Sequence, residues 1–234
     1  MIIRLLAEPD CMLKTQFRSE ALIPIGNHSV FSGFSELLCV HPDAEGFFAS
    51  ATNAEIHHVF RDAVQNNGCP KTINIQPAAL FDKNFLPTLL RALEDNPTID
   101  RQKFCIEITE HGGVSGFDPR ILQFLKDMGI RLALDDFDPR KTEEQIRLSA
   151  YAPYIDMIKF PYQLMSVLRD GKSENKQDAI RLIYDLCDRF HDKAVVMEGV
   201  RGPELPWAKS ELASLGVDYV QIYTPKPPIL ALAS

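Results

Sequence analysis

The stretch Arg131-Leu-Ala-Leu-Asp-Asp-Phe137 is a short apolar run that ends in two adjacent carboxylates. A short apolar run beside a helical pattern is typical of a buried strand in a parallel sheet. The two carboxylates at its end, Asp135 and Asp136, are costly to remove from water unless a cation or hydrogen bonds compensate. Ligand sites in α/β folds lie at the carboxyl ends of such strands. The stretch therefore predicts a divalent-metal site whose other ligands come from neighbouring strands.

The same alternation of patterns continues along most of the chain. The predicted strands are Phe17–Ile25, Val30–Val40, Thr72–Gln76, Phe104–Thr109, Arg131–Phe137, Met157–Phe160, Val195–Glu198 and Tyr219–Tyr223. The predicted helices are Ala54–Asn67, Asn84–Glu94, Pro119–Met128, Glu143–Tyr151, Gln177–Phe190 and Glu204–Leu215. We expect a hairpin turn at Gly26-Asn27 to join the first two strands. Repeated β-α units of this number predict a single α/β domain over residues 1–234, a (β/α)8 TIM-type barrel, with a doubly wound sheet as the alternative.

Composition limits the class of protein. A chain of 234 residues with 45% hydrophobic and 24% charged residues is typical of a globular protein with a sizeable core. Its net charge of −7 argues against nucleic-acid polymers and anionic membranes as partners. The five cysteines are scattered and never spaced as CxxC, which argues against a zinc site or a disulfide framework. Because no apolar run is long enough to span a membrane and the N-terminus lacks a signal-peptide pattern, we expect a cytoplasmic protein.

Period-two alternation divides the predicted strands into two faces. The large aliphatic residues share one parity and should face the surrounding helices: Ile73, Ile75, Ile106, Ile108, Leu132, Leu134, Ile158, Phe160, Val195, Met197, Val220 and Ile222. The other parity carries polar residues that should face the barrel axis near its mouth: Asn74, Glu107, Asp135, Lys159, Glu198 and Gln221. Any one of these taken alone could be a satisfied core residue or a surface residue. Because each comes from a different strand, the whole set favours a shared site.

These residues also carry a family resemblance. The chain resembles the EAL domain, the bacterial cyclic di-GMP phosphodiesterase module, over nearly its full length. The matching segments are Glu107-Ile-Thr-Glu110 for the ExTE motif, Asp135-Asp136-Phe137 for the start of DDFGTG, Asn74 for the VNxS asparagine, Lys159 for the KID lysine, Glu198-Gly-Val for EGVE and Gln221-Ile-Tyr for QGY. The resemblance implies a (β/α)8-type barrel with one antiparallel strand and hydrolysis of cyclic di-GMP to linear pGpG.

The resemblance also implies a role for each polar residue. The implied metal ligands are Glu36, Asn74, Glu107, Asp135 and Asp136, with Asp136 serving a second ion. Carboxylate and amide oxygens select hard cations such as Mg²⁺ or Mn²⁺. The implied catalytic residues are Lys159, which would orient or help deprotonate the attacking water, and Glu198, which would hold metal-bound water together with Gln221. Glu110 would brace the loop after Phe137, and the bland alternative for it is an ordinary acid at a helix start.

The EAL signature itself departs from the family pattern. It should lie in Gly33-Phe-Ser-Glu-Leu-Leu38, where either Ser35 or Glu36 takes the position of the signature glutamate. A Glu36 that faced the helices would be a buried, unpaired charge, so we expect it to point inward. The arginine and tryptophan that follow in the family are absent, and Cys39 and Val40 stand nearby. This removes a phosphate contact, because the guanidinium fork suits phosphate oxygens.

Later motifs depart as well. The expected GTG loop is Asp138-Pro139-Arg140, and proline cannot follow a path that depends on glycine. In the family this loop supports the second metal and a dimer contact. Pro161 stands in place of the KID aspartate, Arg201 in place of the second EGVE glutamate and Ile222 in place of the QGY glycine.

Two functions are compatible with this pattern of retained and lost residues. The first is a metal-dependent phosphodiesterase that hydrolyses cyclic di-GMP, with a two-ion site and a homodimer as expectations. The second is a catalytically degenerate EAL protein that acts as a regulator by binding cyclic di-GMP or a protein partner. Another metal-dependent hydrolase on the same scaffold would explain the carboxylates but not the order of the motifs.

Overall fold

A closed barrel forms the centre of the computed structural model, which describes residues 17–26, 29–40, 50–66, 70–114, 116–170 and 173–223. Its strands are β1 (Phe17–Pro24), β2 (Ser35–Cys39), β3 (Lys71–Ile75), β4 (Phe104–Ile108), β5 (Arg131–Leu134), β6 (Met157–Phe160), β7 (Ala194–Val200) and β8 (Tyr219–Ile222). They pair in chain order, and β8 closes on β1. β1 is antiparallel to both of its neighbours and the other pairs are parallel. The predicted TIM-type barrel with one antiparallel strand is confirmed, and the doubly wound alternative is wrong.

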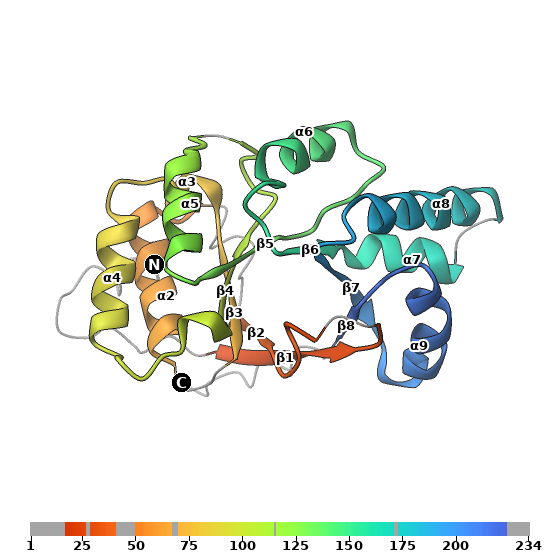
Figure 1. The fold of residues 1–234 in the computed structure, drawn as a ribbon, viewed down its shortest axis with the longest axis horizontal. Coiled ribbons are helices and arrows are strands. Elements are labelled where there is room, and N and C mark those ends of the chain that lie inside the picture. Colours follow the sequence, from red (N-terminus) through yellow and green to blue (C-terminus); the bar gives the residue numbers. More distant parts are fainter. Residues whose placement is uncertain are drawn as a thin grey trace, which may run out of the picture.

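The helices lie outside the barrel. They are α2 (Asn53–Gln65), α3 (Pro77–Leu80), α4 (Phe85–Glu94), α5 (Pro119–Asp127), α6 (Thr142–Tyr151), α7 (Tyr162–Asp170), α8 (Ser173–Arg189) and α9 (Leu205–Ser214), with short 3₁₀ turns at Arg101–Lys103 and Gly202–Glu204. In Figure 1, α2, α4 and α5 lie beside β3 and β4, α6 lies above β5, and α7 to α9 lie on the β6–β8 side. β1 runs across the lower part of this view.

Two local predictions need correction. The second strand begins at Ser35 and not at Val30, because residues 30–33 form a turn in which Gly33 has a φ of 81°. The predicted turn residue Asn27 lies outside the described residues. Helices α3 and α7 were not predicted, and α7 starts directly after Pro161 at the end of β6. Its buried residues Leu164, Met165 and Leu168 nevertheless have helical spacing.

Two separate apolar clusters confirm the predicted sidedness of the strands. The outer cluster packs the barrel against the helices and contains the predicted aliphatic set from Ile73 to Val220, with Ile222 packed against it. The inner cluster fills the barrel and consists of Leu22, Phe31, Phe34, Cys105, Ala133, Met157, Ala194, Val196 and Tyr219. Glu107, Asp135, Lys159 and Gln221 each stand two residues after a member of this inner cluster. The polar residues therefore form a layer above the apolar plug, toward the carboxyl ends of the strands.

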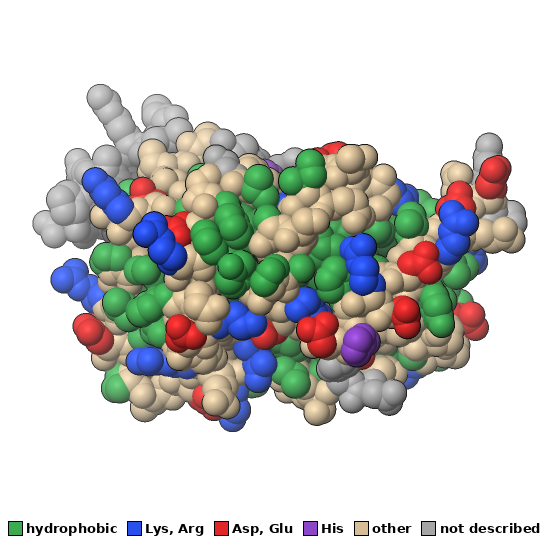
Figure 2. All heavy atoms as spheres, turned by 45° about the horizontal axis from the view of Figure 1, so that its top comes forward, with side chains coloured by type: hydrophobic (Ala, Val, Ile, Leu, Met, Phe, Trp, Pro, Cys, Tyr) green, Lys and Arg blue, Asp and Glu red, His purple; other side chains and the backbone are tan. Residues whose placement is uncertain are grey.

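The surface is mixed in character. Figure 2 shows acidic and basic side chains interspersed on the face in view, with apolar side chains between them. None of the helices that the structure describes has the length and apolar character needed to cross a bilayer.

Candidate active site

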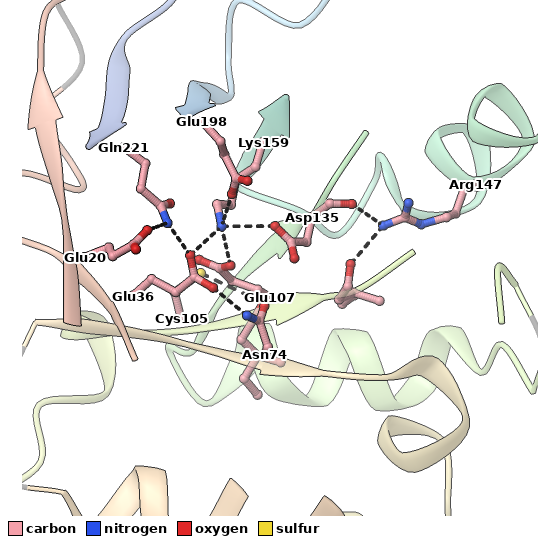
Figure 3. Close-up of polar contacts among 12 residues, drawn as sticks. Glu20, Glu36, Asn74, Cys105, Glu107, Asp135, Arg147, Lys159, Glu198 and Gln221 are labelled. Atoms are coloured by element: carbon pink, nitrogen blue, oxygen red, sulfur yellow. Dashed lines mark hydrogen bonds and ion pairs between the residues drawn. The ribbon is translucent and has the colours of Figure 1, made fainter. Parts of the chain in front are cut away.

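Lys159, on β6, lies at the centre of the site with no exposed surface. Its Nζ donates hydrogen bonds to Glu107 Oε2 at 2.6 Å and to Glu36 Oε2 at 3.0 Å. Oxygens of Glu198 and Asp135 lie 2.6 Å and 3.0 Å from the same nitrogen. Figure 3 shows these carboxylates converging on the ammonium group from different parts of the barrel. The structure thus brings together the residues that alternation predicted to share one centre.

Glu36 points toward the barrel axis, as predicted, and is 3% exposed. Gln221 Nε2 donates to Glu36 Oε2 at 2.6 Å and to Glu20 Oε2 at 3.0 Å, so one amide joins two carboxylates (Figure 3). Asn74 Nδ2 donates to the other oxygen of Glu36. Ser35, the alternative to Glu36, has the opposite parity on β2. Of the two candidates for the signature glutamate, only Glu36 is in contact with the other site residues.

Glu20 is a site residue that the sequence prediction missed. It lies on β1 directly opposite Glu36 and is 6% exposed. The signal was present in the alternation of the first predicted strand, where Arg18, Glu20 and Leu22 share one parity and Leu22 belongs to the inner cluster. The antiparallel strand β1 thus supplies a polar residue to the mouth, as the parallel strands do.

Glu198 lies within a β-bulge of β7. The register of β7 against β8 shifts between Met197 and Val200, and Gly199 has a φ of 73°. A Cβ at Gly199 would lie 2.7 Å from Tyr162 Cδ2, so only glycine fits this position without displacement. Bulges commonly redirect side chains next to functional sites. Here the bulge ends the inward alternation at Glu198, whose carboxylate contacts Lys159.

A second acidic group lies beside the first. Oxygens of Glu110, Asp135 and Asp136 lie within 4.8 Å of one another. Asp136 has a φ of 48°, in the left-handed region that non-glycine residues seldom adopt. Backbone hydrogen bonds hold the residues on either side of it: Asp135 N–H donates to Ile108 O at 3.0 Å, and Phe137 N–H donates to Lys159 O at 2.8 Å. The predicted second-ion ligand is therefore held in a constrained turn at the end of β5.

Arg147, on α6, anchors that turn and was also missed. Its Nη2 donates to Asp135 O at 2.6 Å and to Ile108 O at 2.9 Å, and its Nη1 pairs with Glu144 at 2.6 Å. Arg147 is 1% exposed and joins the ends of β4 and β5 to the helix (Figure 3). Its spacing from Leu148 and Tyr151 would have predicted a buried position, but no sequence pattern indicates which carbonyls a buried arginine reaches.

The loop that departs from the family's glycine motif is closed by an ion pair. Arg140 donates from Nε to Asp138 Oδ1 at 2.8 Å and from Nη2 to Asp138 Oδ2 at 2.6 Å. The backbone N–H of Arg140 also donates to Asp138 Oδ1 at 3.1 Å. Asp138 is buried, so the carboxylate of this ion pair is shielded from water. Side-chain bonding thus supports a turn that Pro139 prevents from following a glycine path.

The electrostatics of the site reflect an excess of buried acid. Burial raises the pKa of Glu107 to about 8, and the neighbouring Glu36 adds to the effect. Burial likewise raises the pKa of Asp136 to about 7, with the Asp135 carboxylate contributing. Burial alone would lower the pKa of Lys159, but the carboxylates around it, led by Asp135 and Glu107, raise that pKa well above its ordinary value. A single ammonium group therefore faces more negative charge than it can neutralise.

The donor set fits a hard divalent cation. The buried atoms Asn74 Oδ1 and Glu107 Oε1 have no hydrogen-bond partner among the described residues. Unsatisfied buried oxygens are costly, and carboxylate and amide oxygens are the ligands that Mg²⁺ and Mn²⁺ prefer. The negative charge that Lys159 does not neutralise also favours a bound cation. Because the Lys159 ammonium occupies the middle of the group, an ion bound there would share these acids with it.

The chain is similar to a family model, to a curated protein and to solved structures. Residues 41–223 match the model of the EAL domain. The chain is 40% identical over 165 residues, 69% of its length, to cyclic di-GMP phosphodiesterase PdeA of Borreliella burgdorferi. The chain spans only 23% of the length of that curated relative.

Solved structures show the same fold. The FimX EAL domain of Pseudomonas aeruginosa bound to c-di-GMP superposes with a TM-score of 0.75 at 17% identity, covering 97% of this chain and 95% of that one. The manganese and cyclic di-GMP complex of Klebsiella pneumoniae BlrP1 gives a TM-score of 0.68 at 23% identity, covering 92% of this chain and 56% of that one.

Proposed function

Because the chain belongs to the EAL domain family, we propose that it is a metal-dependent phosphodiesterase that hydrolyses cyclic di-GMP to linear pGpG. The observation that carries this proposal is the convergence of Glu36, Glu107 and Asp135 around Lys159 at the barrel mouth, with the buried oxygens Asn74 Oδ1 and Glu107 Oε1 left without a hydrogen-bond partner among the described residues. A site built only for stability would have satisfied these atoms.

The proposed ligand set divides into two groups. Glu36, Asn74, Glu107 and Asp135 would hold one Mg²⁺ or Mn²⁺ ion, and Asp136 would serve a second ion beside Glu110. Bound divalent ions neutralise charge on a phosphodiester and lower the pKa of bound water.

Lys159 and Glu198 have the proposed catalytic positions. The ammonium group of Lys159 lies 2.6 Å from both Glu107 and Glu198, so it donates hydrogen bonds toward the reacting centre and fixes the carboxylates around it. Glu198 is the most exposed of the four carboxylates on Lys159, with 18% of its side chain accessible. It is therefore best placed to hold a water molecule that enters from the mouth, and Gln221 would orient the opposite side of the site through Glu36.

The test is direct turnover. The purified chain is incubated with cyclic di-GMP and Mn²⁺ or Mg²⁺, with a chelator in a parallel sample, and the products are resolved by chromatography. We expect pGpG to form only with metal, and Glu107→Ala to abolish it. Glu94→Ala, which removes an exposed carboxylate on α4, is the matched control and should retain turnover. Wild-type protein that yields no pGpG under any metal condition would refute the proposal.

A regulator is the second candidate function. It is favoured by the loop after Asp136, in which the Asp138–Arg140 pair replaces a glycine motif, and by the ammonium group at the metal position. Cyclic di-GMP binding without product would support this candidate. A protein partner at the altered loop belongs to this candidate, whereas a homodimer is compatible with both, and sedimentation with and without cyclic di-GMP would test for either assembly.

A further inference from the structure

Arg18 is an inward-facing arginine at the mouth of the barrel. Burial alternates along the first strand, with Ser19 and Ala21 exposed and Glu20 and Leu22 buried. Leu22 belongs to the inner cluster, so Arg18 shares the parity of the residues that face the axis. Its guanidinium pairs with Glu20, two residues further along the same face.

The direction of β1 places Arg18 above the acidic layer. β1 is antiparallel to β2, with Glu20 opposite Glu36 and Arg18 opposite Leu38. Arg18 therefore stands two residues, about 7 Å along the strand, closer to the mouth than Glu36. Exposure follows the same order, because 25% of the Arg18 side chain is accessible against 7% for Glu20 and 4% for Glu36.

Its position differs from those of the other cations on inward-facing strand positions. Lys159 is fully enclosed by carboxylates. Arg131, at the start of β5, lies over the ring of Phe31 at 5.4 Å and donates to Gln102 O, at the opposite end of the barrel. Among the inward-facing residues on the strands that the structure describes, Arg18 is thus the guanidinium group that an incoming ligand meets at the mouth.

The position of Arg18 suits an anionic ligand with two charged groups, one at the acidic layer and one nearer the mouth. A cyclic dinucleotide carries two phosphodiesters on opposite sides of one ring, and the acidic layer with its cations can accept only one of them. The other must lie nearer the mouth, where unscreened carboxylates would repel it. Cys39 and Val40 cannot supply a positive charge there.

We propose that Arg18 binds the phosphodiester that is not being cleaved, with its guanidinium fork directed at the phosphate oxygens while it stays next to Glu20. This inference rests on the proposed function, since it assigns the ligand class of the same site. It makes Arg18 a substrate-binding residue supplied by the antiparallel strand, in a chain that lacks an arginine after Glu36.

The experiment compares two substrates. Arg18→Gln is expected to raise KM for cyclic di-GMP about tenfold, the effect of one lost charge-assisted contact, with kcat changed less than about threefold. Turnover of bis(p-nitrophenyl) phosphate, which has a single phosphodiester, should not change. Arg18→Lys should recover part of the loss, because it restores charge without the fork. Arg101→Gln, an exposed arginine just before β4 at the far end of the barrel, is the matched control.

A double variant separates ligand binding from a structural role. If Arg18 served only to neutralise Glu20, Arg18→Gln combined with Glu20→Gln would restore wild-type KM. We expect the double variant to remain as weak as Arg18→Gln. Restoration of KM, or an equal loss with both substrates, would overturn the inference.

Equilibrium binding of cyclic di-GMP keeps the two proposals distinguishable. If the wild-type chain binds without hydrolysis, the phosphodiesterase proposal fails, and a tenfold weaker Kd for Arg18→Gln still supports this inference. An unchanged Kd overturns it. A wild-type chain that neither binds nor hydrolyses cyclic di-GMP overturns both.

Discussion

Lys159 Nζ lies 2.6 Å from Glu107 Oε2, and neither side chain has any exposed surface. The two residues come from β6 and β4, which lie on either side of β5, so the pair joins strands that are not direct neighbours. A positive charge supplied by the protein thus occupies the position where the acids would otherwise surround a bound cation. The balance between this ammonium group and a divalent ion is the feature that the first prediction tests.

Replacing Lys159 by methionine should destabilise the metal-free protein and strengthen its response to metal. Breaking a buried ion pair by removing one partner costs about 3 kcal/mol or more. We expect the free energy of unfolding in chelator to fall by about that amount, and Mn²⁺ to raise Tm more in Lys159→Met than in the wild type, because ligands that bind only the folded state stabilise it. Thermal unfolding with and without Mn²⁺ measures both. Lys209→Met, at an exposed position on α9, is the control. Equal Mn²⁺ shifts in variant and wild type would show that Lys159 and the ion do not compete.

Substitutions at the neighbouring residues Ser35 and Glu36 should have very different effects on turnover and Mn²⁺ binding. Glu36 accepts hydrogen bonds from Lys159, Gln221 and Asn74, whereas Ser35 has the opposite parity. Glu36→Gln should lower turnover of cyclic di-GMP by about 100-fold or more and weaken Mn²⁺ binding, since it removes a proposed ligand charge. Ser35→Ala should stay within about twofold of the wild type. Mn²⁺ titration and product analysis on the two variants provide the test. A larger loss of turnover in Ser35→Ala than in Glu36→Gln would assign the position of the signature glutamate to Ser35.

Arg147 should act on the site through the backbone of Asp135. Arg147→Lys retains the charge but cannot reach Asp135 O, Ile108 O and Glu144 together. We expect kcat to fall about tenfold with KM unchanged, and Mn²⁺ affinity to fall, because the strained turn at Asp136 loses its anchor. Steady-state kinetics and Mn²⁺ titration provide the readout, with Arg91→Lys on the exposed face of α4 as the control. A loss of stability that left kcat and Mn²⁺ affinity intact would restrict Arg147 to a structural role.

Lys71 should matter for stability and not for the site. Its Nζ donates to Asn66 O at 2.6 Å, Val64 O at 2.7 Å and Ala63 O at 3.0 Å, which closes the carboxyl end of α2. Lys71→Met should lower the free energy of unfolding by about 3 kcal/mol, since buried carbonyls lose charged donors. Urea denaturation measures this change, and Lys83→Met, at an exposed position, should have little effect. A variant as stable as the wild type would show that water replaces the ammonium group.

The sequence alone determined the sidedness of the strands and hence the composition of the site. Alternation is a local property of an extended chain, so Glu107, Asp135, Lys159 and Gln221 could be assigned to the barrel interior, and Ile106 and its aliphatic counterparts to the helix interface, without any tertiary information. The family motifs predicted the fold because each motif lies at the end of one strand and is therefore also a local feature of the sequence. The metal, catalytic and substrate-binding roles of these residues stay predictions.

The tertiary structure alone decided which of these residues touch. Gln221 and Glu20 are 201 positions apart, and they meet only because β8 closes on an antiparallel β1. The same closure turns Arg18 toward the mouth, and the packing of α6 brings Arg147 to the carbonyl of Asp135. Pattern along a chain specifies the face on which a side chain lies. The residue that this side chain contacts depends on how distant segments pack, which is a property of the closed barrel as a whole.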